Sequence, residues 1–169
     1  MEPRTHRTTW SRTLTVVAAV AVTAILGSGV LTGSHPAEAH GRYKHRVIET
    51  TEAPAAIGPY SQGIGAGRTA YVSGQLPIDP ETGEVLADAD IETQTRQVLR
   101  NVRAVVEADG MTMRHVVSTT VYLQDLDDFD RFNAAYAEFF PKAPPARATV
   151  EVGRLPRDVH VEISAIAVR

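Results

Sequence analysis

The chain has 169 residues, of which 43% are hydrophobic, and a formal net charge of −3. This length fits one domain with its own core and leaves little room for a second. The slight negative charge excludes attraction to nucleic acid or anionic membrane by charge sign alone. The sequence has no cysteine, which excludes disulfides.

Residues 1–39 have the pattern of an export signal. Three arginines precede an uncharged apolar run from Leu14 to Leu31, and Ala37-Glu38-Ala39 has the small-x-small form of a signal-peptidase site. We expect cleavage after Ala39 and an exported (secreted or extracytoplasmic) domain over residues 40–169, without a membrane contact of its own. The run is near the lower limit of a membrane span, so an uncleaved anchor is the alternative.

The first half of residues 40–169 predicts a strand over His45–Thr51, a loop over Ala53–Gly67, a second strand over Thr69–Gln75 and a helix over Ile91–Ala108. Gly63, Gly65 and Gly67 lead into a strand, whereas a phosphate cradle needs a helix behind its glycines. We interpret these glycines as a flexible turn. Asp90 is placed to cap the helix and Gly110 to end it.

The second half predicts a strand over His115–Gln124 and a helix that begins at Asp127 or Asp128 and runs up to Pro141. Two final strands follow, over Ala146–Val152 and Asp158–Val168. The helix carries an aromatic stripe that indicates core packing: Phe129, Phe132, Tyr136, Phe139 and Phe140. A further short strand is expected near Val85. The order predicts an α+β sandwich, with two helices covering one face of a sheet and the other face meeting solvent or another subunit.

Arg147 stands inside a predicted strand, directly after a proline-rich break. Burying an unpaired guanidinium costs several kcal/mol, so we expect either a carboxylate of the protein or a small anionic ligand beside it. Side chains alternate along a strand, so Arg147 should share a face with Thr149 and Glu151. Ala148, Val150 and Val152 would then pack into the core.

Glu162 occupies the corresponding face of the last strand, together with His160 and Ser164. If the last two strands pair as a hairpin, Arg147 and Glu162 lie on the same exposed sheet surface. A solvent-exposed salt bridge there is the alternative to a ligand site. No metal-ligand motif and no nucleophile elbow occur in the sequence, so neither a metal site nor a hydrolytic triad is predicted.

Six segments form a recognisable pattern in order from about Val47 to the C-terminus: Ala53-Pro-Ala-Ala-Ile-Gly-Pro-Tyr60-Ser-Gln, Val72-Ser-Gly-Gln75, Asp79-Pro with Gly83-Glu84, Asn133-Ala-Ala-Tyr-Ala-Glu-Phe-Phe140, Pro145-Ala-Arg147 with Val150-Glu-Val152, and Arg154-Leu-Pro to Ala165-Ile-Ala-Val-Arg169. In these segments the chain resembles the Rid proteins, the reactive-intermediate or imine deaminases also known as the YjgF family. It is most similar to the RidA branch.

The resemblance implies a chorismate-mutase-like α+β fold, a homotrimer with three clefts between subunits, and an enzyme without metal or organic cofactor. The implied reaction is hydrolysis of reactive 2-imino or enamino acids to 2-keto acids and ammonia. In that pattern Arg147 holds the substrate carboxylate and Glu162 positions or deprotonates the attacking water. Tyr60, Ser73, Gly74, Asn133 and Thr149 match the remaining cleft positions.

The chain departs from the resemblance at two positions on the final strands. Thr149 stands where many members have cysteine, and Ser164 where an acidic residue is common. The main alternative to an enzyme is a non-catalytic trimer that binds small carboxylates or protects unfolding proteins. The family has also been labelled as ribonuclease, but the acidic chain lacks the basic stripe that RNA binding usually shows.

Overall fold

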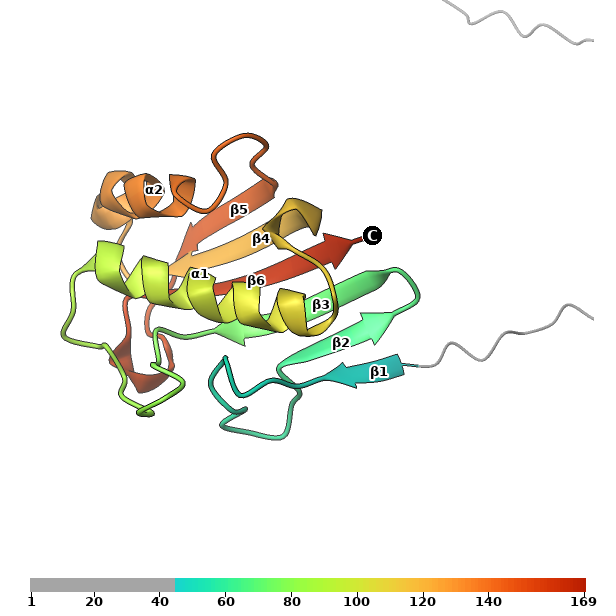
Figure 1. Cartoon of the computed structure of the whole chain (residues 1–169). Helices are drawn as coiled ribbons and strands as arrows, with labels where there is room; N and C mark the ends of the chain where they lie inside the picture. Colours follow the sequence, from blue (N-terminus) through green and yellow to red (C-terminus); the bar gives the residue numbers. More distant parts are fainter. Residues whose placement is uncertain (1–44) are drawn as a thin grey trace, which may run out of the picture. The chain divides into compact units, whose positions relative to one another are not determined.

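A computed structural model describes residues 45–169, which form one six-stranded mixed sheet with two helices on one face (Figure 1). In chain order the elements are β1 His45–Ile48, β2 Gly63–Ala66, β3 Thr69–Gln75, α1 Ile91–Ala108, β4 Val116–Leu123, α2 Phe129–Ala137, β5 Ala146–Glu151 and β6 Val161–Val168. The strands lie in the order β1-β2-β3-β6-β4-β5, and only β4 and β5 pair in parallel. The predicted α+β sandwich is confirmed.

The two helices form where local sequence signals predict them. The Asp90 side chain accepts a hydrogen bond from the Thr93 backbone N–H at 2.7 Å and caps α1, and Gly110 follows its end with a positive φ of 73°. The apolar stripe of α1 is fully buried against the sheet. Helix α2 is shorter than predicted, because regular helix ends at Ala137 and not at Pro141.

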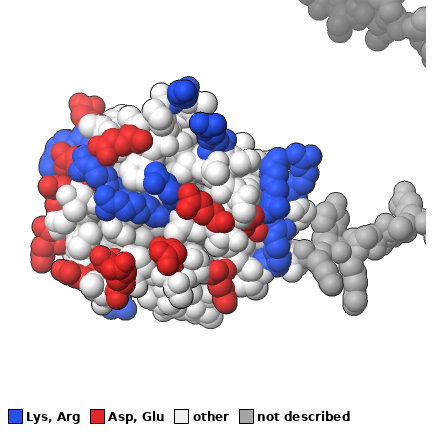
Figure 2. Space-filling view, in the orientation of Figure 1, with Lys and Arg blue, Asp and Glu red and all other residues white. Residues whose placement is uncertain are grey.

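Charged side chains of both signs alternate over the helix-covered face (Figure 2). Ion pairs explain part of this pattern, since Arg96 contacts Glu138 at 2.7 Å and Arg131 contacts Glu92 at 2.6 Å. Both pairs join α1 to α2 or to its C-terminal end. Such exposed pairs each contribute only about 0–1 kcal/mol, so the buried apolar stripe remains the main support of the helix layer.

The interpretation of Ala53–Gly67 as a loop is wrong at its end, where β2 lies. Gly63 and Gly65 are strand residues rather than turn residues, and only Gly67 has a positive φ, 58°. A Cβ at Gly63 would lie 2.9 Å from Cγ1 of Val105, and one at Gly65 would collide with the Arg46 side chain. These two glycines therefore allow close packing. The strand was not predicted from the sequence, because glycines have no side chains that could show the apolar–polar alternation of a strand.

The last two strands do not pair as a hairpin, so the condition for a shared surface of Arg147 and Glu162 is not met. β5 pairs with β4, and β4 separates it from β6. The connection from β4 to β5 runs through α2, which supplies the crossover that parallel neighbours need (Figure 1). Ala148 and Val150 are exposed on the face without helices, so the expectation that they pack into the core is incorrect.

The sheet face without helices carries a row of apolar residues at one side. Residues paired across strands share a face, so Val47, Ile64, Tyr71 and Ile166 form one row across β1, β2, β3 and β6. Tyr71 is 50% exposed and Ile166 36%. Within residues 45–169 nothing covers this row. We call the whole sheet face without helices the open face.

The predicted export signal, its cleavage after Ala39 and the alternative anchor lie outside the described residues. Between residues 45 and 169, no helix is both long enough and apolar enough to cross a membrane. The short strand expected near Val85 is present only as an isolated bridge between Val85 and Ile78.

Candidate functional site

Arg147 lies on the helix-covered face of β5, beneath α2. Its Nη2 donates a hydrogen bond to Oδ1 of Asn133 at 2.7 Å. Its Cζ lies 4.7 Å from the ring centre of Tyr136, 5.2 Å from Phe132 and 5.6 Å from Phe129. No carboxylate within residues 45–169 forms an ion pair with Arg147. Neutral groups thus hold the guanidinium, and its other donors are available to an anion.

The ring of Tyr136 is fixed by a buried hydrogen bond. Its hydroxyl and Oγ1 of Thr119 are 2.8 Å apart, and Thr119 is the register partner of Arg147 on β4. Burial raises the pKa of Tyr136, while the Thr119 hydrogen bond and the Arg147 charge act in the opposite direction. Tyr136 is therefore neutral at physiological pH and offers Arg147 the face of an uncharged ring.

Thr149 lies two residues beyond Arg147 on the same strand face. Its Oγ1 is buried and has no hydrogen-bond partner within the described part of the chain. A buried hydroxyl without a partner is unfavourable, so this atom is a ready donor to a ligand or water beside Arg147. We call Arg147, Asn133 and Thr149, together with the three rings, the arginine half-site.

Glu162 lies on the open face of β6 and is half-buried, and this burial raises the pKa of its carboxyl group. The neighbouring strand β3 has a bulge opposite Ser164, two residues from Glu162, because the β3–β6 register passes from Val72↔Ala165 to Gln75↔Ile163. Gly74 lies in this bulge. A Cβ there would be 2.8 Å from Cδ of Glu162 and even closer to its Oε1. The carboxylate thus occupies space that only glycine leaves free.

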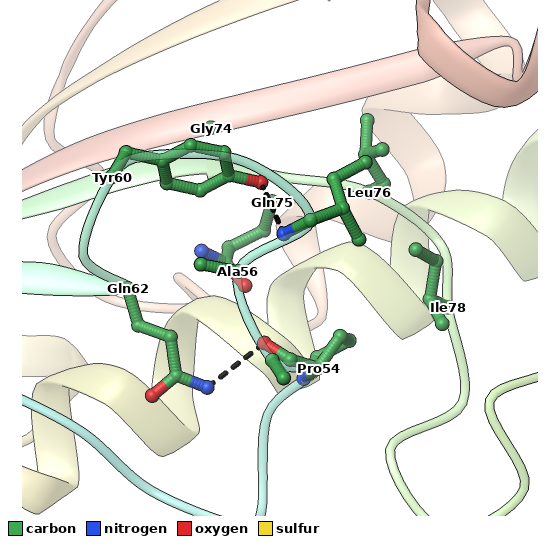
Figure 3. Close-up of a pocket in the computed structure, with 10 residues that line it drawn as sticks. Pro54, Ala56, Tyr60, Gln62, Gly74, Gln75, Leu76 and Ile78 are labelled. Carbon is green, nitrogen blue, oxygen red and sulfur yellow. Dashed lines mark hydrogen bonds between the residues drawn. The ribbon is translucent and has the colours of Figure 1, made fainter.

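Ser73 and Tyr60 adjoin Gly74. The Ser73 hydroxyl donates to the backbone oxygen of Ser61 at 2.7 Å, so its proton is already engaged. Tyr60 is 47% exposed and its hydroxyl accepts a hydrogen bond from the Ile57 N–H at 3.3 Å (Figure 3).

Tyr60 and Gly74 line a small cavity of about 20 Å³, which has room for about one water. Small and apolar residues form much of its remaining wall: Pro54, Ala55, Ala56, Ile57, Leu76 and Ile78. We call Glu162, Gly74, Ser73 and Tyr60 the glutamate half-site.

The two half-sites are far apart within one chain. Arg147 pairs with Thr119 and Glu162 with Tyr122, three residues further along β4, and a whole strand separates β5 from β6. Strand spacing and rise therefore put the two Cα atoms roughly 14 Å apart. The side chains also point to opposite faces, so the predicted shared surface does not exist. No small carboxylate can contact both residues of one protomer.

Comparison with known proteins identifies the family. The family model described as endoribonuclease L-PSP matches residues 50–169. This chain belongs to the endoribonuclease L-PSP family, which is also known as the YjgF or Rid family.

Two curated relatives illustrate how variously members of the L-PSP family are named. A RutC family protein of Pyrococcus horikoshii is 54% identical over 121 residues, 72% of this chain and 95% of that protein. The 2-iminobutanoate/2-iminopropanoate deaminase of Escherichia coli is 52% identical over 127 residues, 73% of this chain and 98% of the enzyme.

A solved L-PSP family structure, E. coli TdcF with bound serine, superposes with a TM-score of 0.71 at 46% identity. The match covers 73% of this chain and 98% of that one. The fold inferred above is therefore the family fold.

Three residues of the arginine half-site were predicted only as core. Phe129, Phe132 and Tyr136 were identified from their helical spacing, and Asn133 shares their side of α2 because it lies four residues beyond Phe129 and three before Tyr136. The spacing was visible in the sequence, but the strand beneath this side was not. That strand is β5, and it brings Arg147 under the rings.

Proposed function

We propose that this chain is an imine deaminase, which hydrolyses 2-imino or enamino acids to 2-keto acids and ammonia. The observation that carries the proposal is the guanidinium of Arg147, held by Asn133 and three rings with no carboxylate of residues 45–169 as its partner. Such a group can bind a planar carboxylate in a bidentate, oriented way. The 52% identical relative named 2-iminobutanoate/2-iminopropanoate deaminase supports the same substrate class.

The complete site is assigned to the junction of two copies of the chain. Arg147 and Glu162 lie on opposite faces of one protomer, so the arginine half-site of one copy must meet the glutamate half-site of another. The open face, with exposed Tyr71 and Ile166, offers the apolar surface that such an assembly would bury. We propose a homotrimer with three clefts of this composition.

Each residue then has one step in the reaction. Arg147 binds the carboxylate of the protonated imine, and the unpartnered Thr149 hydroxyl donates a hydrogen bond to the substrate or the water. Glu162 of the adjoining protomer accepts a proton from water as the oxygen bonds to the imine carbon, which moves the C=N π electrons to nitrogen. Protonated Glu162 returns this proton to the carbinolamine nitrogen and then accepts the hydroxyl proton, which it finally loses to solvent. The C–N bond then breaks to release ammonia and the keto acid.

Two predicted site residues act through others in this scheme. Asn133 accepts from Arg147, so it orients the guanidinium. Ser73 donates to Ser61 and can offer a ligand only its acceptor lone pairs, so it mainly positions the segment that carries Tyr60. Because the imine carbon is already electrophilic, orientation is the main contribution expected of the protein, and no resident cofactor is needed.

The test is keto-acid release by purified residues 40–169, with the imine generated in situ by an amino-acid oxidase or a serine/threonine dehydratase. We expect acceleration over the spontaneous reaction, abolished in Arg147→Ala and strongly reduced in Arg147→Lys, which lacks the planar fork. Full activity in Arg147→Ala would refute the assignment. Binding of a small carboxylate without acceleration would favour the alternative of a non-catalytic binding or protective trimer.

We further propose that the domain acts outside the cytoplasm, because residues 1–39 have the export-signal pattern described above. Expression of the full chain in its own host, followed by N-terminal sequencing of the exported protein, tests this. A mature terminus at His40 is expected, and full-length protein retained in the cytoplasm would refute it.

A further inference from the structure

The segment that carries Tyr60 lacks regular structure of its own. Residues 50–61, which we call the Tyr60 loop, connect β1 to β2 and contain neither helix nor strand. Its backbone groups therefore have no ladder partners, and each buried one needs a hydrogen bond from elsewhere. What holds this loop decides where the exposed ring of Tyr60 stands.

The buried side chain of Gln62, only 6% exposed, supplies much of that bonding. Its Nε2 donates to the backbone oxygens of Thr50 at 3.0 Å, Ala53 at 3.0 Å and Pro54 at 2.8 Å. Figure 3 shows the hydrogen bond to Pro54. Its Oε1 accepts from the Thr50 N–H at 2.8 Å. An amide nitrogen has two protons, so one of them is shared between two of the three carbonyls. Both ends of the amide are thus bonded to the loop.

The end of the loop nearest Tyr60 is fastened to the bulge of β3. The Ser73 N–H donates to the backbone oxygen of Gln62 at 3.0 Å, and the Ser73 hydroxyl to that of Ser61 at 2.7 Å. Gly74, which makes room for the Glu162 carboxylate, follows Ser73 directly. Gln62 therefore joins the loop's start, through Thr50, to the strand position beside Gly74.

We propose that Gln62 is a positioning residue for the deamination: it holds the Tyr60 loop as a preformed wall of the cleft, with the Tyr60 ring beside Gly74 and Glu162. This inference rests on the proposed function for its catalytic consequence, but not for its structural one. The side chain acts through the backbone of the loop and needs no contact with substrate.

The test compares Gln62→Glu with the wild-type chain. The substitution keeps the size of the side chain but points a carboxylate oxygen at three carbonyl oxygens. The three hydrogen bonds that Nε2 donates are therefore replaced by repulsion. Gln62→Met, which removes the bonds without adding charge, serves as a milder second variant. Val106→Ala, a buried truncation near the C-terminal end of α1, is the matched control for a general loss of stability.

In both Gln62 variants we expect amide hydrogen exchange to accelerate at Thr50 and Ile57, whose N–H groups are hydrogen-bonded within this arrangement. We expect kcat to fall by about ten- to hundredfold, as for a misplaced cleft group, with KM nearly unchanged because Arg147 is untouched. Val106→Ala should show neither effect. In a Tyr60→Ala background, Gln62→Met should reduce kcat much less, since the group it positions is already absent.

Unchanged exchange at Thr50 and Ile57 in a folded Gln62 variant would overturn the proposal. So would a loss of kcat no greater than that of Val106→Ala, or full additivity with Tyr60→Ala. If the wild-type chain did not accelerate imine hydrolysis, the proposed function would fall. The exchange measurement would still decide whether Gln62 holds the Tyr60 loop.

Discussion

Complementation between two inactive variants tests the division of the site between protomers. Arg147→Ala removes the proposed carboxylate anchor, and Glu162→Gln removes the group proposed to accept the water proton. Each variant alone should form inactive oligomers, because every cleft lacks one group. Since Arg147 and Glu162 lie on opposite faces, with roughly 14 Å between their Cα atoms, the proposed cleft takes one residue from each of two neighbouring copies.

The expected activity of a mixture follows from counting. A cleft is intact when its arginine comes from a Glu162→Gln protomer and its glutamate from an Arg147→Ala protomer. With equal amounts and random assembly, each condition holds half the time, so about one quarter of the clefts are restored. If one protomer supplied both residues, no mixture would contain an intact cleft.

The assay is keto-acid release after the two variants are unfolded, mixed in equal amounts and refolded together, with each variant refolded alone as control. Wild-type protein treated in the same way gives the full-activity reference. Activity near one quarter of that reference supports the two-protomer cleft. Activity no higher than that of the separate variants would refute the argument from sheet register, even if the protein is an active deaminase.

Three further predictions concern single substitutions. Gly74→Ala should push the Glu162 carboxylate aside, costing about 1–3 kcal/mol and at least tenfold in kcat, whereas Gly153→Ala, with open space around it, should change neither thermal stability nor turnover. Asp109 is nearly buried and contacts Arg46 and Arg169, and the Arg46 hydrogen bond lowers its pKa most strongly. The contribution of ionised Asp109 to the free energy of unfolding is therefore present above about pH 4, and it is lost as the pH falls through the lowered folded-state pKa. Asp109→Asn should then cost about 2 kcal/mol in urea unfolding at pH 7 and much less at strongly acidic pH; an equal cost at both would contradict this. Burial raises the pKa of Glu162, so its charged form is disfavoured in the folded state, and Glu162→Gln should raise the melting temperature at pH 7 by an amount that shrinks on acidification. A lower melting temperature of the variant at pH 7 would contradict this expectation.

Local signals predicted the helices well because those signals act within a few residues. The Asp90 cap, the apolar stripe of α1 and Gly110 each depend only on helical spacing, and all three are found where they were expected. The strand pairing of β5 depends on contacts that the local sequence does not encode. Nothing within Ala146–Glu151 states whether β4 or β6 lies beside it.

The face of Arg147 was misjudged because both faces of β5 differ from a simple inside–outside pattern. Alternation assigned Val150 to the core and Arg147 to the surface, yet Val150 is 44% exposed on the open face. Arg147 instead lies beneath aromatic rings of α2. The rule that apolar residues face the helices fails where the opposite face is itself apolar.

The family pattern placed Arg147 and Glu162 in clefts between subunits, but it did not say which subunit supplies each residue. The register of β4 bears on this question: Thr119 and Tyr122 hold the two residues on different faces and at different positions along the sheet, so one protomer cannot supply both to one small ligand. The open face that leaves Tyr71 and Ile166 exposed gives each protomer a reason to associate, and association is also what would bring the two half-sites together. Stability and catalysis would then depend on the same contact. Loss of assembly should therefore remove activity even in a chain whose own fold is intact.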